Sequence, residues 1–184
     1  MCKNDTLDDL LLFETSRRNT DLVAEIIIQK PELFEQLFSV FVRNVEPLSR
    51  RAAWVIDTVS EKHPGLIAPH LKDIIDLLSK FRHDGLKRHS MRILARSPLP
   101  IEPHLGELLK VSFEWLLSPK EAIATKIYCM EILYRSSQVE PDLKKELADT
   151  IEWRLNEESA GFKNRGQKML KKLYLEIDNL IKPA

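Results

Sequence analysis

The chain has 184 residues, of which 43% are hydrophobic and 30% are charged, and it contains only five glycines. This composition is typical of an ordered protein with a buried core and excludes a disordered or low-complexity chain. Lysine plus arginine and aspartate plus glutamate number 28 each, so the net charge indicates no general attraction to nucleic acid or to an anionic membrane.

The N-terminal segment MCKNDTLDDLLLFETSRR has no basic region followed by an apolar core, and no apolar run reaches the roughly 18 residues of a membrane span. We therefore expect no membrane association and a cytoplasmic location. Cys2 and Cys129 lie far apart without a CxxC pattern. Two plain thiols are predicted, and neither a disulfide nor a zinc site.

Four segments that begin with proline share one pattern along the chain. They are PELFEQLFSVFV from Pro31, PHLKDIIDLL from Pro69, PHLGELLKVSFEWLL from Pro103 and PDLKKELADTIEWRL from Pro141. Proline is tolerated in the first turn of a helix, and the apolar residues behind each proline recur at three- and four-residue spacing. Each segment is therefore predicted to be an amphipathic helix.

Each of these segments is predicted to be the second helix of a pair, with a first helix in front of it. SMRILARS at 90–97 and CMEILYRS at 129–136 match each other, and RRAAWVIDTVSEKHP at 50–64 takes the equivalent place. The pattern indicates a single domain, 1–184, made of antiparallel helix pairs. The pairs cover about 20–43, 47–80, 84–117 and 120–156, with capping helices near 5–17 and 160–180. No segment alternates with period two, so we expect essentially no sheet.

Two-helix units of this length are typical of tetratricopeptide, HEAT and armadillo arrays. The Trp, Leu-Gly and Tyr positions of the tetratricopeptide pattern are missing. Asp84 followed by Lys87 and Arg88, with Met91 and Leu94 behind them, is similar to the first helix of a HEAT repeat. The chain thus resembles the HEAT/armadillo-like family over about residues 20–180. The resemblance implies an all-α, right-handed solenoid with a concave face.

The resemblance also implies a column of basic residues that pair with acids between repeats and form an inter-repeat ladder. The members in register are Arg50, Lys87, Lys126 and Arg165.

Chemistry-bearing motifs are few. The fragment WVID contains Trp54 and Asp57, which share a helix face, and some HEAT-like DNA glycosylases use aromatic and acidic residues together. This pair is a weak catalytic candidate, because Trp54 aligns with core positions of the repeat. Trp115 and Trp153 also align with each other, which indicates packing. His70 and His104 hold equivalent positions but are predicted to lie too far apart to share a metal ion.

No phosphate-binding, dinucleotide-binding or metalloprotease motif is found, so we expect no cofactor and no metal, and we favour a non-enzymatic protein over an enzyme. The second helices lean acidic, and in HEAT-like arrays such helices usually line the concave face. We expect a non-enzymatic scaffold that binds a protein or peptide, in particular a basic one, on that face. The candidate partner-binding residues are Asp73, Asp76, Glu107, Glu114, Asp149 and Glu152.

The alternative is a nucleic-acid-binding or DNA-alkylation-repair-like HEAT protein that uses its basic first helices. Its candidate residues are Arg82, Lys87, Arg88, Arg92, Lys168, Lys171 and Lys172. A solvated convex face together with the inter-repeat ladder explains the same basic residues, and we favour that interpretation over phosphate binding. Partner identity and oligomeric state stay open at this point.

Overall fold

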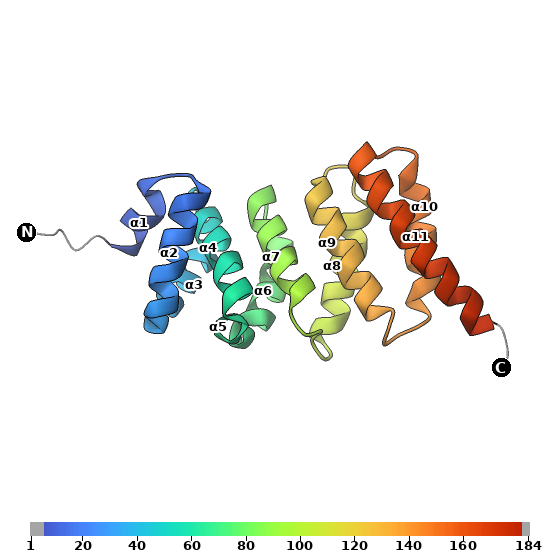
Figure 1. Cartoon of the computed structure of the whole chain (residues 1–184), viewed down its shortest axis with the longest axis horizontal. Coiled ribbons are helices and arrows are strands. Elements are labelled where there is room, and N and C mark those ends of the chain that lie inside the picture. The colour runs from blue at the N-terminus through green and yellow to red at the C-terminus, as the bar shows by residue number, and fades with distance from the viewer. Residues whose placement is uncertain (1–5, 182–184) are drawn as a thin grey trace, which may run out of the picture. The chain divides into compact units, whose positions relative to one another are not determined.

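The computed structural model describes residues 6–181 of the chain, which are α-helices and short 3-10 turns without a strand (Figure 1). The all-α prediction is confirmed. Cα packing divides the chain into an N-terminal unit up to Pro98 and a C-terminal unit from Leu99. The single array and its right-handed superhelix stay predictions. Within residues 6–181, no helix combines the length and the apolar character of a membrane span.

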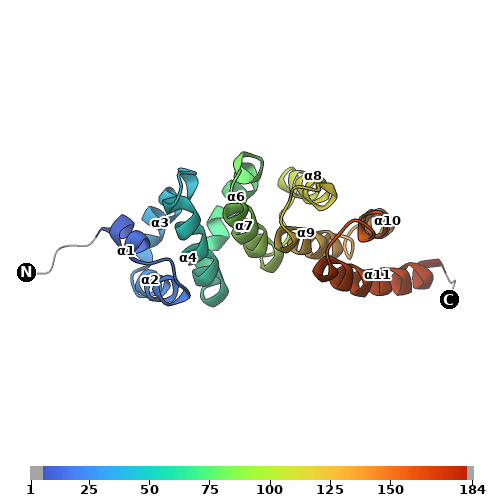
Figure 2. The same cartoon turned by 90° about the horizontal axis from the view of Figure 1, so that it is seen from above.

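The N-terminal unit consists of paired helices in two layers. Figure 2 shows α3 and α6 on one side of the unit, and α2, α4 and α7 on the other. Helix α4 packs against α2, α3 and α7 and is therefore the central element. The helices of this unit are α1 (Leu7–Phe13), α2 (Arg17–Gln29), α3 (Phe34–Val42), α4 (Leu48–Lys62), α5 (Pro64–Ile67), α6 (Leu71–Leu77) and α7 (Asp84–Arg96).

The C-terminal unit repeats this arrangement with two helix pairs. Helix α8 packs on α9, α10 packs on α11, and α9 also contacts α10 and α11. In Figure 2, α8 and α10 lie on one side of this unit, and α9 and α11 lie on the other. The helices are α8 (His104–Leu117), α9 (Ile123–Ser136), α10 (Leu143–Leu155) and α11 (Ala160–Ile181).

The core of each unit comes from the apolar faces predicted by the helical spacing. Ile56 of α4 and Leu37 of α3 are buried in the first unit, and Leu147 and Ile151 of α10 are buried in the second. Burying an aliphatic side chain of this size contributes about 1.5–3 kcal/mol. Because one helix pair cannot cover its own apolar face, each pair depends on its neighbour.

The recurrent prolines lie where the second helices begin, as predicted. Pro31 opens a 3-10 turn before α3, and Pro69 lies in the 3-10 turn before α6. Pro103 directly precedes α8, and Pro141 lies two residues before α10. The structure adds the one-turn helix α5 between α4 and α6, which the sequence pattern did not predict. A second proline, Pro64, occupies the first position of that turn.

Two glycines allow close approach of neighbouring helices. A Cβ on Gly85 of α7 would lie 2.8 Å from Cδ of Arg50 on α4. A Cβ on Gly166 of α11 would lie 3.0 Å from Cγ2 of Ile151 and 3.1 Å from Cδ2 of Leu155, both on α10. Larger side chains at these positions would push the paired helices apart.

Candidate functional site

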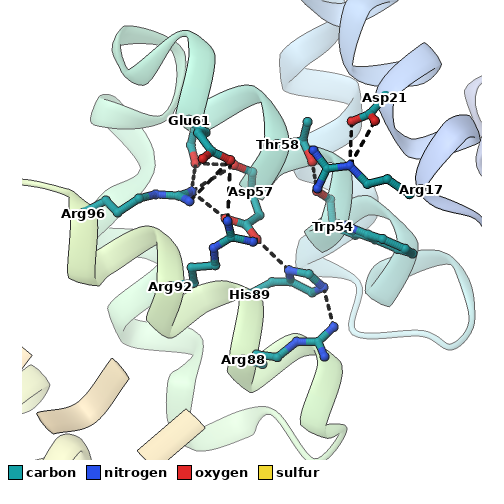
Figure 3. Close-up of polar contacts among 11 residues, drawn as sticks. Arg17, Asp21, Trp54, Asp57, Thr58, Glu61, Arg88, His89, Arg92 and Arg96 are labelled. Atoms are coloured by element: carbon teal, nitrogen blue, oxygen red, sulfur yellow. Dashed lines mark hydrogen bonds and ion pairs between the residues drawn. The ribbon is translucent and has the colours of Figure 1, made fainter. Parts of the chain in front are cut away.

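A buried carboxylate joins α4 to α7 in the N-terminal unit (Figure 3). Asp57 of α4 is 1% exposed, and its Oδ2 lies 2.8 Å from Nδ1 of His89 and 3.2 Å from Nη1 of Arg92. Its Oδ1 accepts a hydrogen bond of 2.5 Å from Nη2 of Arg96. A buried charge is tolerated only where it is paired and hydrogen-bonded, and all three partners come from one helix.

Helical spacing explains why α7 supplies all three groups. Residues 89, 92 and 96 recur at three- and four-residue intervals and so share the face of α7 that packs on α4. Glu61 follows Asp57 by four residues on α4, and its Oε2 lies 3.6 Å from Arg92 and 3.7 Å from Arg96. Two carboxylates thus face two guanidinium groups across the α4–α7 contact.

His89 completes the cluster as a neutral ring. Burial lowers the pKa of His89, and the nearby Arg88 and Arg92 lower it further, although the hydrogen bond to Asp57 acts in the opposite direction. The geometry fits this state, because Nδ1 can donate to Asp57 while Nε2 accepts from Nη2 of Arg88 at 3.1 Å. The indole of Trp54 stacks on the imidazole, with ring centroids 6.1 Å apart.

The surroundings of Trp54 and Asp57 do not match the accessible cleft that a hydrolase would need. Asp57 is buried and its oxygens are engaged by α7, so it is not open to a substrate. The cavity beside half-buried Trp54 has a volume of about 10 Å³, which is far too small for a nucleotide. The cluster therefore acts as a polar contact between two helices. The sequence did not reveal it, because its members are 32 to 39 residues apart.

The basic residues of the nucleic-acid alternative lie in two separate groups. Arg82, Lys87, Arg88 and Arg92 lie on or just before α7, and Lys168, Lys171 and Lys172 lie on α11. Arg82 and Arg88 are exposed, but Arg92 is held by Asp57 and Glu61. On α11, Lys168 and Lys171 are exposed, and Nζ of Lys172 lies 5.3 Å from the ring centroid of Tyr134.

The residues of the predicted basic ladder differ in their partners. Arg50 pairs at 3.0 Å with Glu46, four residues earlier in the chain. Lys126 of α9 is buried and pairs with Glu158, which lies just before α11. Arg165 of α11 pairs with Glu131 of α9 at 2.7 Å. The last two pairs join consecutive repeat elements in the C-terminal unit.

The carboxylate of Glu158 is shared, because Arg154 also donates to it at 2.7 Å. Burial would raise the pKa of Glu158, but the hydrogen bonds from Lys126 and Arg154 outweigh burial and lower it. A second such group is Glu176 of α11. Burial alone would raise its pKa, whereas hydrogen bonds from Lys144, Tyr134 and Gln138 lower it to about 2.

The acidic candidates Asp73 and Asp76 line a groove between α3 and α6. Its volume is about 310 Å³, and its other lining residues are the apolar Phe38, Val42 and Leu77. Both carboxylates are exposed. The groove thus combines apolar surface with negative charge. Sequence reasoning found the two acids but missed the apolar members, because amphipathic spacing assigns such residues to the core.

His70 holds α6 against α3 beside this groove. Its Nε2 lies 3.1 Å from Oε1 of Glu35, its Nδ1 lies 3.8 Å from Oδ2 of Asp73, and its ring lies 4.2 Å from that of Phe38. His70 is therefore engaged by side chains of its own unit. Among residues 6–181, no group of three or more His, Cys, Asp or Glu side chains could hold a metal ion. Cys129 is buried, and Cys2 lies outside the described residues.

The remaining acidic candidates belong to α8 and α10. Glu107 is half-buried and lies 3.9 Å from Lys110, whereas Glu114 is exposed. Asp149 and Glu152 are exposed on α10. Tyr174 of α11 donates a hydrogen bond to Glu152, and this bond, together with burial and the charge of Asp149, raises the pKa of Tyr174 to about 12.

Both units thus consist of stacked antiparallel helix pairs in which polar contacts join neighbouring repeats, which defines the class of α-helical repeat proteins. The HEAT repeat domain matches residues 7–173, so the chain belongs to the HEAT repeat family. HEAT repeats generally serve as protein-interaction scaffolds. No curated protein and no solved structure matches the chain.

Proposed function

We propose that the protein is a non-enzymatic cytoplasmic scaffold that binds a basic segment of a protein partner along its second helices. The observation that carries the proposal is the groove between α3 and α6, with Phe38, Val42 and Leu77 beside Asp73 and Asp76. Ligand sites in proteins usually combine apolar surface with a few polar groups that orient the ligand. This groove meets that description.

The chemistry of the groove supports a partner of one kind. Apolar side chains of a bound segment would gain by burial against Val42 and Leu77, while lysine or arginine would be attracted by the two carboxylates. An acidic segment would be repelled. The partner is therefore a polypeptide in which a lysine or arginine lies close to an apolar side chain.

Selection from a random displayed peptide library tests this proposal. We expect the immobilised protein to enrich peptides with Lys or Arg next to an apolar residue, and the double variant Asp73→Asn/Asp76→Asn to lose that enrichment. The control, Asp21→Asn/Asp84→Asn, removes the same charge from the same unit but outside the groove, and it should enrich the same peptides as the wild type. Enrichment of acidic peptides, or identical enrichment by the groove variant, would refute the proposal.

The nucleic-acid alternative predicts a different response. Titration with a labelled oligonucleotide should then show an affinity that falls steeply with salt and that depends on Arg82 and Arg88. Capture from a native lysate with and without nuclease distinguishes the two hypotheses as well. Polypeptides that stay bound after nuclease support the scaffold, whereas material lost with nuclease supports the alternative.

A further inference from the structure

The two faces of α10 carry opposite charge, although the helix as a whole is neutral. Its cations Lys144 and Arg154 are each 5% exposed and turn inward to glutamates, Lys144 to Glu176 and Arg154 to Glu157 and Glu158. The acidic side chains, by contrast, lie on the exposed face together with a single lysine. The acids are Glu146, Asp149 and Glu152, and the lysine is Lys145. The outer face of α10 is therefore negative.

A large aromatic side chain lies on this acidic face. Trp153 is 67% exposed, whereas Trp115, its counterpart in α8, is 8% exposed. The expectation that both tryptophans are packing residues is thus wrong for Trp153. Asp149 precedes Trp153 by four residues, so the carboxylate and the indole are neighbours on the helix surface. An exposed tryptophan loses favourable apolar burial, and a partner that covers it would recover that energy.

We propose that the outer face of α10, formed by Glu146, Asp149, Glu152 and Trp153, is a recognition surface for an arginine side chain of a protein partner. A guanidinium group stacks on an aromatic ring and forms paired hydrogen bonds with a carboxylate, whereas an ammonium group is a strongly hydrated point charge. The face offers both groups, with the carboxylates of Glu146 and Asp149 beside the indole of Trp153, while Glu152 also accepts a hydrogen bond from Tyr174. The guanidinium carbon of Arg154 already lies 5.9 Å from the Trp153 ring centroid, and the 67% exposure of Trp153 leaves aromatic surface for a second guanidinium group.

This inference rests on the proposed function, a basic protein partner, and adds a second contact in the other unit together with a preference for arginine over lysine. The test uses labelled oligoarginine and oligolysine peptides of equal length, titrated against the full chain by fluorescence anisotropy. We expect oligoarginine to bind about fivefold more tightly than oligolysine. Trp153→Leu, which keeps apolar area but has no aromatic face, should lower this ratio clearly toward one, because only the carboxylate contacts would then favour arginine.

Two further variants are controls for the preference. Trp153→Phe keeps an aromatic ring and should therefore retain part of the preference for oligoarginine over oligolysine. Glu140→Gln/Asp178→Asn removes two exposed charges of the same unit and should leave the ratio unchanged. Because Trp153 is largely exposed, its variants should unfold at the same denaturant concentration as the wild type, which separates a loss of recognition from a loss of folding.

The groove variant Asp73→Asn/Asp76→Asn distinguishes failure of this inference from failure of the proposed function. If that variant weakens both peptides while Trp153→Leu keeps the arginine preference, the groove stands and the α10 surface is refuted. If Trp153→Leu lowers the arginine preference while Asp73→Asn/Asp76→Asn leaves both peptide affinities unchanged, the α10 surface stands and the groove is refuted. The absence of saturable binding, or equal binding of both peptides by the wild type, overturns the inference.

Discussion

Replacing Asp57 by asparagine is expected to destabilise the N-terminal unit strongly. The substitution preserves side-chain shape but removes the negative charge that lies between His89, Arg92 and Arg96. The asparagine oxygen has two lone pairs and can still accept hydrogen bonds at one of the two carboxylate-oxygen positions. Its amide nitrogen, however, faces groups that are themselves donors, so at least one guanidinium hydrogen bond is lost.

The magnitude follows from the burial of the partners. Removing one member of a buried ion pair destabilises a protein by about 3–5 kcal/mol. The Arg92 and Arg96 side chains are 31% and 32% exposed, and Glu61 stays beside them, so water and Glu61 offset part of the loss. We therefore expect about 3 kcal/mol, the lower end of that range. With an m-value of about 1.5 kcal/mol/M, the urea midpoint falls by about 2 M.

Equilibrium unfolding in urea, followed by tryptophan fluorescence, measures this change. Trp54 is the tryptophan of the N-terminal unit and stacks on His89, so it reports directly on the cluster. A Trp115→Phe/Trp153→Phe background removes the other two signals. Asp21→Asn is the matched control, because the pair of Asp21 with Arg17 is largely exposed and such pairs contribute about 0–1 kcal/mol.

A midpoint for Asp57→Asn within 0.3 M of the control, roughly 0.5 kcal/mol at that m-value, would refute the reasoning. It would mean that the ion cluster contributes no more than a surface pair.

Three further predictions concern the C-terminal unit. Lys126→Ala should lower the free energy of unfolding by about 3 kcal/mol in a urea titration, because it leaves the largely buried Glu158 with one cation fewer. Gly166→Val should destabilise by about 1–3 kcal/mol in the same assay, because its side chain would clash with α10, whereas Gly161→Val in the open first turn of α11 should change stability far less. Glu176 has a pKa of about 2 in the fold against about 4.3 when unfolded, so its contribution is present at neutral pH and is lost as the pH falls from about 5 to 2. Glu176→Gln should consequently show a smaller decrease in thermal midpoint over that range, and an unchanged decrease would contradict the assigned hydrogen bonds.

The helices could be predicted from the sequence because their signals are local. Proline in the first turn and apolar residues at helical spacing depend only on residues close together in the chain, so the starts of α3, α6, α8 and α10 could be predicted. The repetition of this pattern indicated the HEAT family, which the match over residues 7–173 shows. Helix α5 was missed because a one-turn helix is too short to have a period.

The candidate site residues could be predicted from the sequence only in part. Asp73, Asp76, Asp149 and Glu152 were chosen from the sequence for their charge, and they are exposed. The sequence placed Asp57 on the helix face of Trp54, but the partners of Asp57 could not be foreseen, because they lie 32 to 39 residues away in the chain. Which side chains of α7 contact Asp57 depends on how α7 is rotated against α4, and tertiary packing sets that rotation.

The sequence by itself determined the helices, their pairing and the acidic character of the second helices, because propensity, spacing and composition act locally. Only the tertiary structure decided which equivalent side chains are buried. Trp115 and Trp153 hold the same place in their repeats, yet one is buried and the other exposed. The exposure of a side chain depends on which neighbouring helix covers it. Lys144 and Arg154 turn inward for the same reason, since their glutamate partners lie on or beside other helices.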